Sequence, residues 1–159
     1  MKPPEQTERV IKTIIKNRRA WHDYEIVQSV EAGIVLLGTE VKSLRAGKCN
    51  VADAYASFPS KSSTDLYLVN FNITPYEHGT HENHEPRRQR KLLLNRREAA
   101  KLFTAVQEKG MTLIPLSLYF SGCFVKVELG LVKAKKKYDK RESAKEKEHD
   151  REIRRKFRT

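Results

Sequence analysis

Alternating apolar and polar side chains run through much of this chain and predict a protein built mainly of β-strands. The alternation is clearest where Val125, Val127 and Leu129 fall on one face while Lys126 and Glu128 fall on the other. A period of two residues is typical of a half-buried strand. Short continuous apolar runs predict two further, buried strands over residues 34–37 and 92–94, and the remaining strands are expected over residues 24–30, 66–73, 113–120 and 124–132.

The first two of these strands are predicted to form a hairpin. Residues 31–33 between them read Glu-Ala-Gly, and Gly33 can adopt the positive φ of a tight turn. Glu31 is therefore expected at an exposed turn. The preceding segment, Val10–Lys16, is compatible with either a short helix or a strand. In the strand over residues 66–73, one face is expected to carry Tyr67, Val69, Phe71 and Ile73.

Two helices are predicted from capping residues and apolar spacing. Thr39 is expected to cap a short helix that ends at Gly47. Asn95 is expected to cap a longer helix that ends at Gly110, and a further helical turn is expected over residues 50–55. In the longer helix, apolar side chains recur at helical spacing, at Ala99, Leu102, Phe103 and Val106.

These elements favour a mainly β fold with some α-helix. Short antiparallel strands together with one well-capped helix are typical of a small closed or partly open barrel, and an OB-like fold is one candidate. We therefore expect an OB-like β-barrel of six or seven mostly antiparallel strands with two or three short helices. A long loop with almost no apolar residues is expected over residues 75–90.

Positive charge is concentrated in the last part of the chain. Residues 133–159 hold 13 Lys and Arg against 6 Asp and Glu, a net charge of +7, whereas the other 132 residues hold 19 against 14, a net charge of +5. These 27 residues contain almost nothing that could pack in a core. We expect a barrel domain over residues 1–133 and a basic tail over residues 134–159, the tail being disordered when free and helical against a partner.

The net charge of +12 and the isoelectric point of about 9.8 indicate a nucleic-acid partner first and an acidic membrane surface second. A membrane partner is not expected, because the sequence has no apolar run near the ~18 residues of a span and no lipidation signal. The two cysteines have no paired spacing and no signal peptide is evident, so a reduced, cytoplasmic protein is expected.

Catalytic and metal chemistry find little support. His22, Asp23 and Ser29 occur without the nucleophile elbow or phosphate-binding loop that would accompany such residues in an enzyme. The three histidines of the long loop, His78, His81 and His84, lie among Gly, Asn and Pro residues that disfavour a helix, so a solvated loop is favoured over a metal site. No enzyme activity, cofactor or metal is expected.

Several stretches of the sequence resemble the SmpB family, the SsrA-binding proteins. The resemblance runs in order from about Asn17 to Arg141, and the run Gly38–Lys48 (GTEVKSLRAGK) is long enough to be highly specific. The other matching stretches are NRRA at 17–20, HDY at 22–24, EAGI at 31–34, RKLLL at 90–94, KGMTLIP at 109–115, VKV at 125–127 and YDKR at 138–141. One departure is Ala134, where the family usually has glycine before two lysines, and alanine disfavours positive φ at this hinge into the tail.

The resemblance implies a function and a set of partners. It implies a protein that binds the tRNA-like domain of transfer-messenger RNA and delivers this RNA to stalled ribosomes for trans-translation, with elongation factor Tu on the charged RNA as a further partner. In this interpretation the tail acts in the decoding centre and mRNA channel of the small subunit. The alternative is a structural ribosomal protein with a basic extension.

The resemblance also implies roles for particular residues. The family's RNA-facing glutamate matches Glu31, its basic helix matches Lys42 and Arg45, and its late-strand lysine matches Lys126. Further RNA-binding candidates are Asn17, Arg18, Tyr24, Arg90, Lys91, Lys133, Lys135 and Lys136. The family's decoding-centre residues match Tyr138, Asp139, Lys140 and Arg141.

Overall fold

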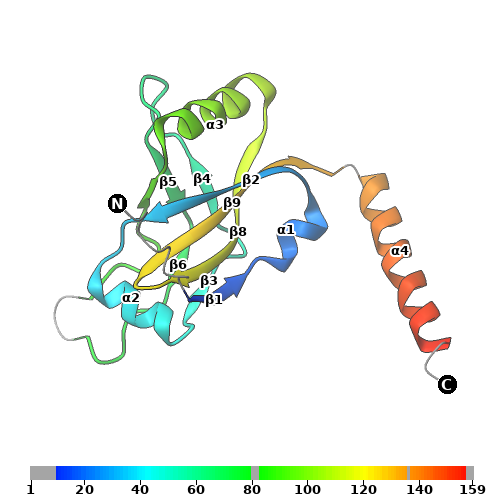
Figure 1. Ribbon diagram of the computed structural model, residues 1–159, viewed down its shortest axis with the longest axis horizontal. Helices are drawn as coiled ribbons and strands as arrows, with labels where there is room; N and C mark the ends of the chain where they lie inside the picture. The colour runs from blue at the N-terminus through cyan, green and yellow to red at the C-terminus, as the bar shows by residue number, and fades with distance from the viewer. Residues whose placement is uncertain (1–9, 80–82, 136, 157–159) are drawn as a thin grey trace, which may run out of the picture.

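A computed structural model describes residues 10–79, 83–135 and 137–156 of the chain, and Figure 1 shows a β-barrel with a helix projecting from it. The elements in chain order are β1 (Ile11–Lys16), α1 (Arg18–Asp23), β2 (Tyr24–Ile34), α2 (Gly38–Arg45), β3 (Cys49–Asn50), β4 (Tyr55–Ser57), β5 (Leu66–Val69), β6 (Asn72–Ile73), β7 (Arg90–Leu93), α3 (Arg96–Lys109), β8 (Thr112–Ser121), β9 (Phe124–Ala134) and α4 (Lys137–Lys156).

The main sheet closes on itself. Its seven strands follow the order β1-β8-β4-β5-β7-β2-β9, and an additional pairing of β8 with β9 completes the ring. Every pairing is antiparallel, and β1 lies beside the end of β8. Closure removes the exposed edges of the six strands from β8 round to β9, whereas β1 lies outside the ring and pairs with β8 alone. The predicted mainly β barrel is confirmed, and the ambiguous segment before it is a strand.

The predicted turn at residues 31–33 is wrong. β2 is one continuous strand of 11 residues, in which Glu31 pairs with Glu128 and Gly33 with Lys126. Gly33 also pairs with Leu93, and a Cβ atom at Gly33 would lie 3.3 Å from the Leu93 Cβ. The glycine therefore serves the close approach of two strands rather than a turn.

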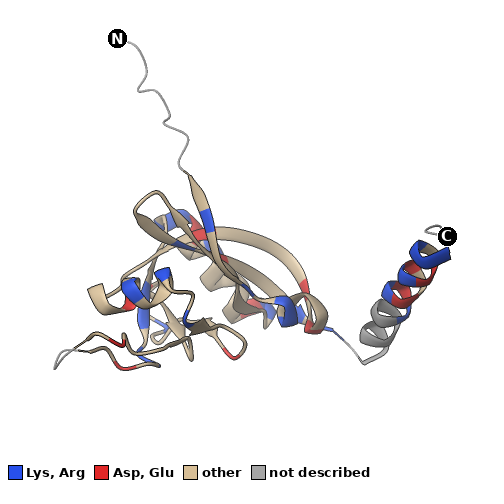
Figure 2. Ribbon diagram, turned by 90° about the horizontal axis from the view of Figure 1, so that it is seen from below, with Lys and Arg blue, Asp and Glu red and all other residues tan. Residues whose placement is uncertain are grey.

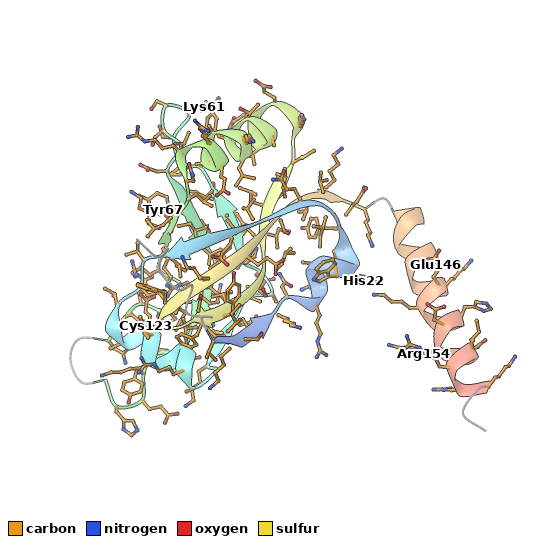
Figure 3. All side chains as sticks on the ribbon, viewed as in Figure 1. His22, Lys61, Tyr67, Cys123, Glu146 and Arg154 are labelled. Carbon is orange, nitrogen blue, oxygen red and sulfur yellow. The ribbon has the colours of Figure 1, made fainter. Side chains whose placement is uncertain are left out.

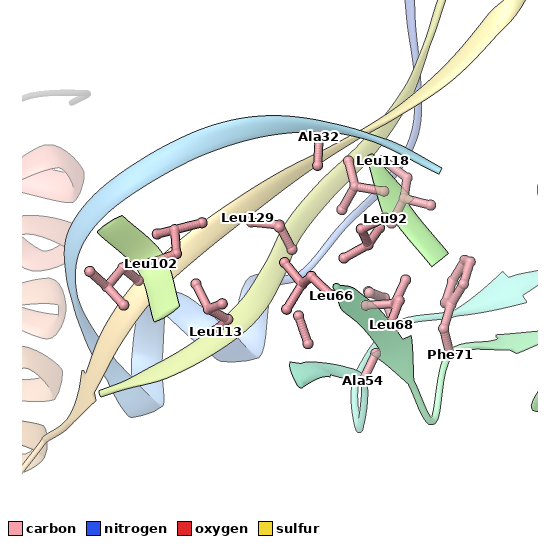
Figure 4. Packing of buried hydrophobic residues seen from close by; sticks show 14 of the residues in the cluster. Ala32, Ala54, Leu66, Leu68, Phe71, Leu92, Leu102, Leu113, Leu118 and Leu129 are labelled. Carbon is pink, nitrogen blue, oxygen red and sulfur yellow. The ribbon is translucent and has the colours of Figure 1, made fainter. Parts of the chain in front are cut away.

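The main core fills the barrel interior. Leu66, Leu68 and Phe71 are at most 2% exposed, and the alternating residues of β9 meet them from the opposite wall (Figure 4). Burying a side chain of this size stabilises the fold by about 1.5–3 kcal/mol. The face predicted for residues 66–73 is wrong in part, because Asn70 adopts a φ of 58° and ends β5. Leu66 and Leu68 point inward before this break, and Phe71 and Ile73 do so after it.

A second, smaller cluster lies under α1 and consists of Ala20, Ile114, Leu116 and Val132. Their strand neighbours, such as Leu113 and Leu131, belong to the main core, so this cluster is on the other side of the barrel wall. Irregularities in the pairing of β8 and β2 accompany this change of face. Ala20 is the only buried residue of α1, and this helix was not predicted.

The predicted longer helix is confirmed as α3. The Asn95 side chain accepts a hydrogen bond of 3.1 Å from the Arg97 amide, and Gly110 adopts a φ of 63°. The Thr39 cap is wrong, because α2 begins at Gly38 and the Glu40 carboxylate accepts from the Leu37 amide at 2.9 Å. The helical turn over residues 50–55 is also wrong, since strands β3 and β4 occupy the ends of that segment.

The tail carries helix α4, which projects beside α1 (Figure 1). The expectation that residues 134–159 are disordered in the free protein stays a prediction. Figure 2 shows that basic and acidic residues interleave along the part of α4 that it colours. Within the described ranges, no helix is both long and apolar enough to cross a membrane.

Candidate RNA interface

A polar strip crosses the outer face of β2, β9 and β8. Glu31 lies opposite Glu128, which lies opposite Ser117, and in the next row Gly33 lies opposite Lys126, which lies opposite Tyr119. Figure 3 shows how densely side chains cover these strands. The strip unites two of the residues implied by the resemblance, Glu31 and Lys126.

Each carboxylate of the strip is held by a hydroxyl group. The Tyr119 hydroxyl donates a hydrogen bond to Glu31, and the Ser117 hydroxyl donates one of 2.9 Å to Glu128. Burial, followed by the bond to Glu31, raises the pKa of Tyr119, so this hydroxyl stays protonated and remains a donor. Glu31 is exposed and keeps further lone pairs for an external donor. Tyr119 was not among the predicted site residues.

The arrangement suits the minor-groove face or an unpaired base of a folded RNA. An exposed carboxylate can accept from a 2′-hydroxyl or a base amino group. The Lys126 ammonium in the next row can hold a phosphate. A hydroxyl that fixes one carboxylate oxygen limits the directions in which the other can accept. The strip can therefore recognise and orient RNA, but it has no nucleophile–base pair for chemistry.

The second surface is the exposed side of α2. Glu40, Ser43 and Leu44 are buried and anchor the helix, which leaves Lys42 and Arg45 facing solvent. The Ser43 hydroxyl donates to the Thr74 carbonyl at 2.7 Å and fixes the loop that follows β6.

A cleft of about 580 Å³ separates α2 from the loop after β6. Lys42 Nζ lies 5.4 Å from the centre of the Tyr76 ring, and the Lys48 ammonium pairs with the Glu77 carboxylate at the rim. Cations beside an aromatic ring can hold the phosphate and the base of one nucleotide. Tyr76 was missed because it lies in the long loop expected over residues 75–90. The lining residues are Lys42, Ser43, Arg45, Ala46, Lys48, Tyr76, Glu77 and His78.

Arg90 is a correction to the predicted RNA-binding set. Its side chain is fully buried, and its guanidinium bonds to the Glu40 carboxylate and to the Phe71 and Pro86 carbonyls. Arg88 also donates to Glu40, at 2.6 Å. Burial raises the pKa of Glu40, but hydrogen bonds from Arg88, the Leu37 amide and Arg90 outweigh it and hold the pKa below its usual value. Arg90 thus joins β7 to α2 from within.

Asn17 is a second correction. The residue is 3% exposed. Its side-chain nitrogen Nδ2 donates to the Pro115 carbonyl at 2.9 Å, and its side-chain oxygen Oδ1 accepts from the Ala20 backbone amide at 3.3 Å. It is the cap of α1 and leaves no surface for RNA.

The remaining candidates divide between two places. Lys91 is exposed on β7 and lies 3.6 Å from the Asp65 carboxylate. Arg18, Tyr24, Lys133 and Lys135 gather at the other end of β2, where Tyr24 pairs with Ala134 and Glu25 with Lys133. Tyr24 lines a cleft of about 380 Å³ beside Arg19, Asp53 and Tyr55.

The predicted decoding-centre residues lie at the start of α4. Tyr138, Asp139, Lys140 and Arg141 belong to this helix, but their side chains and Lys136 lie outside the described residues. Immediately before them, the Lys135 amide donates to the Asp23 carbonyl at 3.2 Å and its ammonium to the Trp21 carbonyl at 3.3 Å. The root of the tail is thereby fixed to α1.

Two of the three histidines of the long loop, His84 and His78, have separate partners in the structure. His84 is 5% exposed, with Nε2 2.9 Å from the Ile73 carbonyl and Nδ1 3.0 Å from the Thr39 hydroxyl. His78 packs its ring against Tyr76, and His81 lies outside the described residues. Among residues that the structure describes, no group of three His, Cys, Asp or Glu residues could hold a metal ion.

A closed antiparallel barrel with a polar strip, a basic helix and a cationic tail places the chain among small nucleic-acid-binding β-barrels. Residues 14–159 match the family model of the SmpB protein, and the chain belongs to the SmpB family. The SsrA-binding protein of Carboxydothermus hydrogenoformans is 51% identical over 142 residues, which are 89% of this chain and 93% of the relative. That of Geobacillus thermodenitrificans is 52% identical over 147 residues, 92% of this chain and 93% of the relative.

Solved structures extend the likeness to three dimensions. A chain from a structure described as "tmRNA-SmpB: a journey to the center of the bacterial ribosome" superposes with a TM-score of 0.64 at 51% identity. The match covers 77% of this chain and 85% of the other. Similar sequence and similar fold therefore point to the same family.

Proposed function

We propose that this chain binds the tRNA-like domain of transfer-messenger RNA and delivers that RNA to stalled ribosomes. Its membership of a family of SsrA-binding proteins carries this proposal. The structural neighbour, described as tmRNA–SmpB in the bacterial ribosome, supports the same two partners. The chain acts by binding, and bond-making belongs to the ribosome.

Two surfaces of the barrel divide the recognition of the RNA. The strip of Glu31, Tyr119 and Lys126 reads donor groups, and the cleft beside Lys42 and Arg45 holds the phosphate backbone. Both lie on the barrel, and among the residues whose side chains the structure describes, the buried apolar ones run from Ala20 to Val132. The barrel should therefore fold and bind without α4.

The tail acts after the RNA is bound. Tyr138 stacks on an unpaired base of the decoding centre, Lys140 and Arg141 hold phosphates, and Asp139 accepts from a base or orients Arg141. Because α4 is highly charged, we propose that its helix becomes stable only where an RNA-lined channel surrounds it.

A gel-shift titration at a fixed, stated salt concentration tests this function. The full chain should bind a transcript of the tRNA-like domain far more tightly than an elongator tRNA of similar size. A chain ending at Lys133 should retain most of that affinity and fail to support peptide tagging on stalled ribosomes. Equal affinity for the two RNAs would refute the proposed partner, and a large loss on truncation would move the main site into the tail.

A further inference from the structure

Helix α1 exposes an aromatic side chain that the proposed RNA contacts do not use. Trp21 is 57% exposed and is the single tryptophan of the chain. Arg18, Arg19 and His22 on the same helix are also exposed, and Figure 3 labels His22 at α1. An indole left in water forgoes a large burial free energy, so its exposure favours a binding role.

The scaffold under Trp21 is rigid. The Asn17 amide donates to the Leu116 carbonyl at 2.8 Å, and the Asn17 side chain ties the start of the helix to Pro115 and Ala20. At the other end, Lys135 donates to the carbonyls of Trp21 and Asp23. A ring held on a fixed backbone loses little entropy when a partner covers it.

The described part of the tail from Lys145 to Lys156 is a poor occupant for this ring. From Lys145 to Lys156 the only apolar side chain is Ile153, which is 39% exposed. The remaining side chains of that segment are charged or histidine. A nucleobase suits the site better, because it stacks on indole while the surrounding cations meet its phosphates.

The position of Trp21 favours ribosomal RNA over transfer-messenger RNA as the partner of the ring. Tyr24 and Glu31 are seven residues apart on β2, which separates α1 from the strip by about 23 Å. The tail that is proposed to enter the ribosome begins beside Trp21. We infer that Trp21 stacks on an unpaired base of ribosomal RNA, with the exposed Arg18 of the same helix near a flanking phosphate. The inference rests on the proposed function.

Fluorescence of the single tryptophan tests the stacking directly. An oligoadenylate hexamer should quench Trp21 in the full chain, whereas an abasic ribose-phosphate hexamer of the same charge should not. Ile153→Ser should leave the emission unchanged. Equal quenching by the two hexamers would show that the contact depends on phosphate charge and not on base stacking. A changed emission in the Ile153 variant would show that the indole packs against the tail. Either result overturns the inference.

Substitutions identify the RNA. Trp21→Leu should weaken binding of the protein–RNA complex to stalled ribosomes by about 5- to 100-fold, and Trp21→Phe should retain most of the binding. Both variants should melt like the original protein and bind the isolated tRNA-like domain normally. Loss of binding to that domain alone would place the ring on transfer-messenger RNA, and a lowered melting temperature of Trp21→Leu would make the residue structural; both outcomes contradict the inference. If the original protein fails to bind the domain, the proposed function fails instead.

Discussion

Glu40 and Arg90 lie fifty positions apart in sequence and form an ion pair in which neither side chain is exposed. Glu40 belongs to the helix that presents Lys42 and Arg45, and Arg90 belongs to a strand of the barrel wall. The pair therefore sets the position of the basic helix relative to the barrel.

Glu40→Ala should lower the free energy of unfolding by about 3–5 kcal/mol, because it leaves Arg90 buried without its carboxylate. Urea denaturation measures this loss. Glu77→Ala, which breaks the exposed pair with Lys48, is the matched control and should leave stability nearly unchanged. Similar losses in both variants would contradict a special role for the buried pair.

The same pair predicts how stability depends on pH. The lowered pKa of Glu40 means that the folded state favours the carboxylate, so its contribution is present above the ordinary value of 4.5. The contribution is lost as the pH falls through the lowered pKa of the folded protein. The free energy of unfolding should decrease below about pH 4.5, and this part of the decrease should be absent in Glu40→Gln.

Glu31→Ala should weaken binding to the tRNA-like domain by about 10- to 100-fold, the range expected for a hydrogen bond to a charged group. Tyr119→Phe should weaken it less, because the carboxylate remains but is no longer oriented. Glu25→Ala, on the same strand and with the same change of charge, should bind normally. Gel shift measures the binding, and thermal melting checks that each variant is folded. An unfolded Glu31 variant would show that the residue is structural and would contradict the prediction.

Arg45→Ala should reduce the dependence of RNA binding on salt. Each lost phosphate contact lowers the slope of log affinity against log salt by about 0.9. Lys101→Ala removes the same charge from the exposed face of α3 and should leave the slope unchanged. Equal changes in the two variants would show that only overall charge matters.

Changing Asp139, Lys140 and Arg141 together to Ala should preserve affinity for the tRNA-like domain and abolish tagging of stalled chains. The control changes Lys145, Glu146 and Lys147 to Ala, which removes the same net charge from the same helix. A reconstituted tagging assay measures both variants. Normal tagging by the first variant would leave the tail as an electrostatic tether.

Local patterns were sufficient for the regular parts of this fold. β9 and α3 follow from the alternation around Val127 and from the caps at Asn95 and Gly110, because neighbouring residues alone determine these features. α1 escaped prediction because it buries only Ala20 and so shows no apolar periodicity.

The roles of Gly33, Arg90 and Tyr119 could not be predicted, because contacts between residues far apart in the sequence determine them. Gly33 resembles a turn residue until the approach of Leu93 is known. Arg90 lies in a run of cations that suggests a phosphate site, and its partner Glu40 is remote in sequence. Tyr119 acquires a role only because β8 and β9 bring it to Glu31. Such contacts leave no periodic signal in the chain.

The continuous pairing of β2 with β9 fixes the distance between the Glu31 end of the barrel and the root of the tail. Tyr24 pairs with Ala134 at one end and Gly33 with Lys126 at the other. Deleting one residue between Gln28 and Glu31 would turn the Glu31 carboxylate toward the core, because side chains alternate along a strand. Only paired changes of two residues in both strands would keep its direction, and each would move it by about 7 Å from the root of the tail. Variation in length is therefore expected in the loops over residues 58–65 and 74–89, while the distance between the two ends of β2 stays constant.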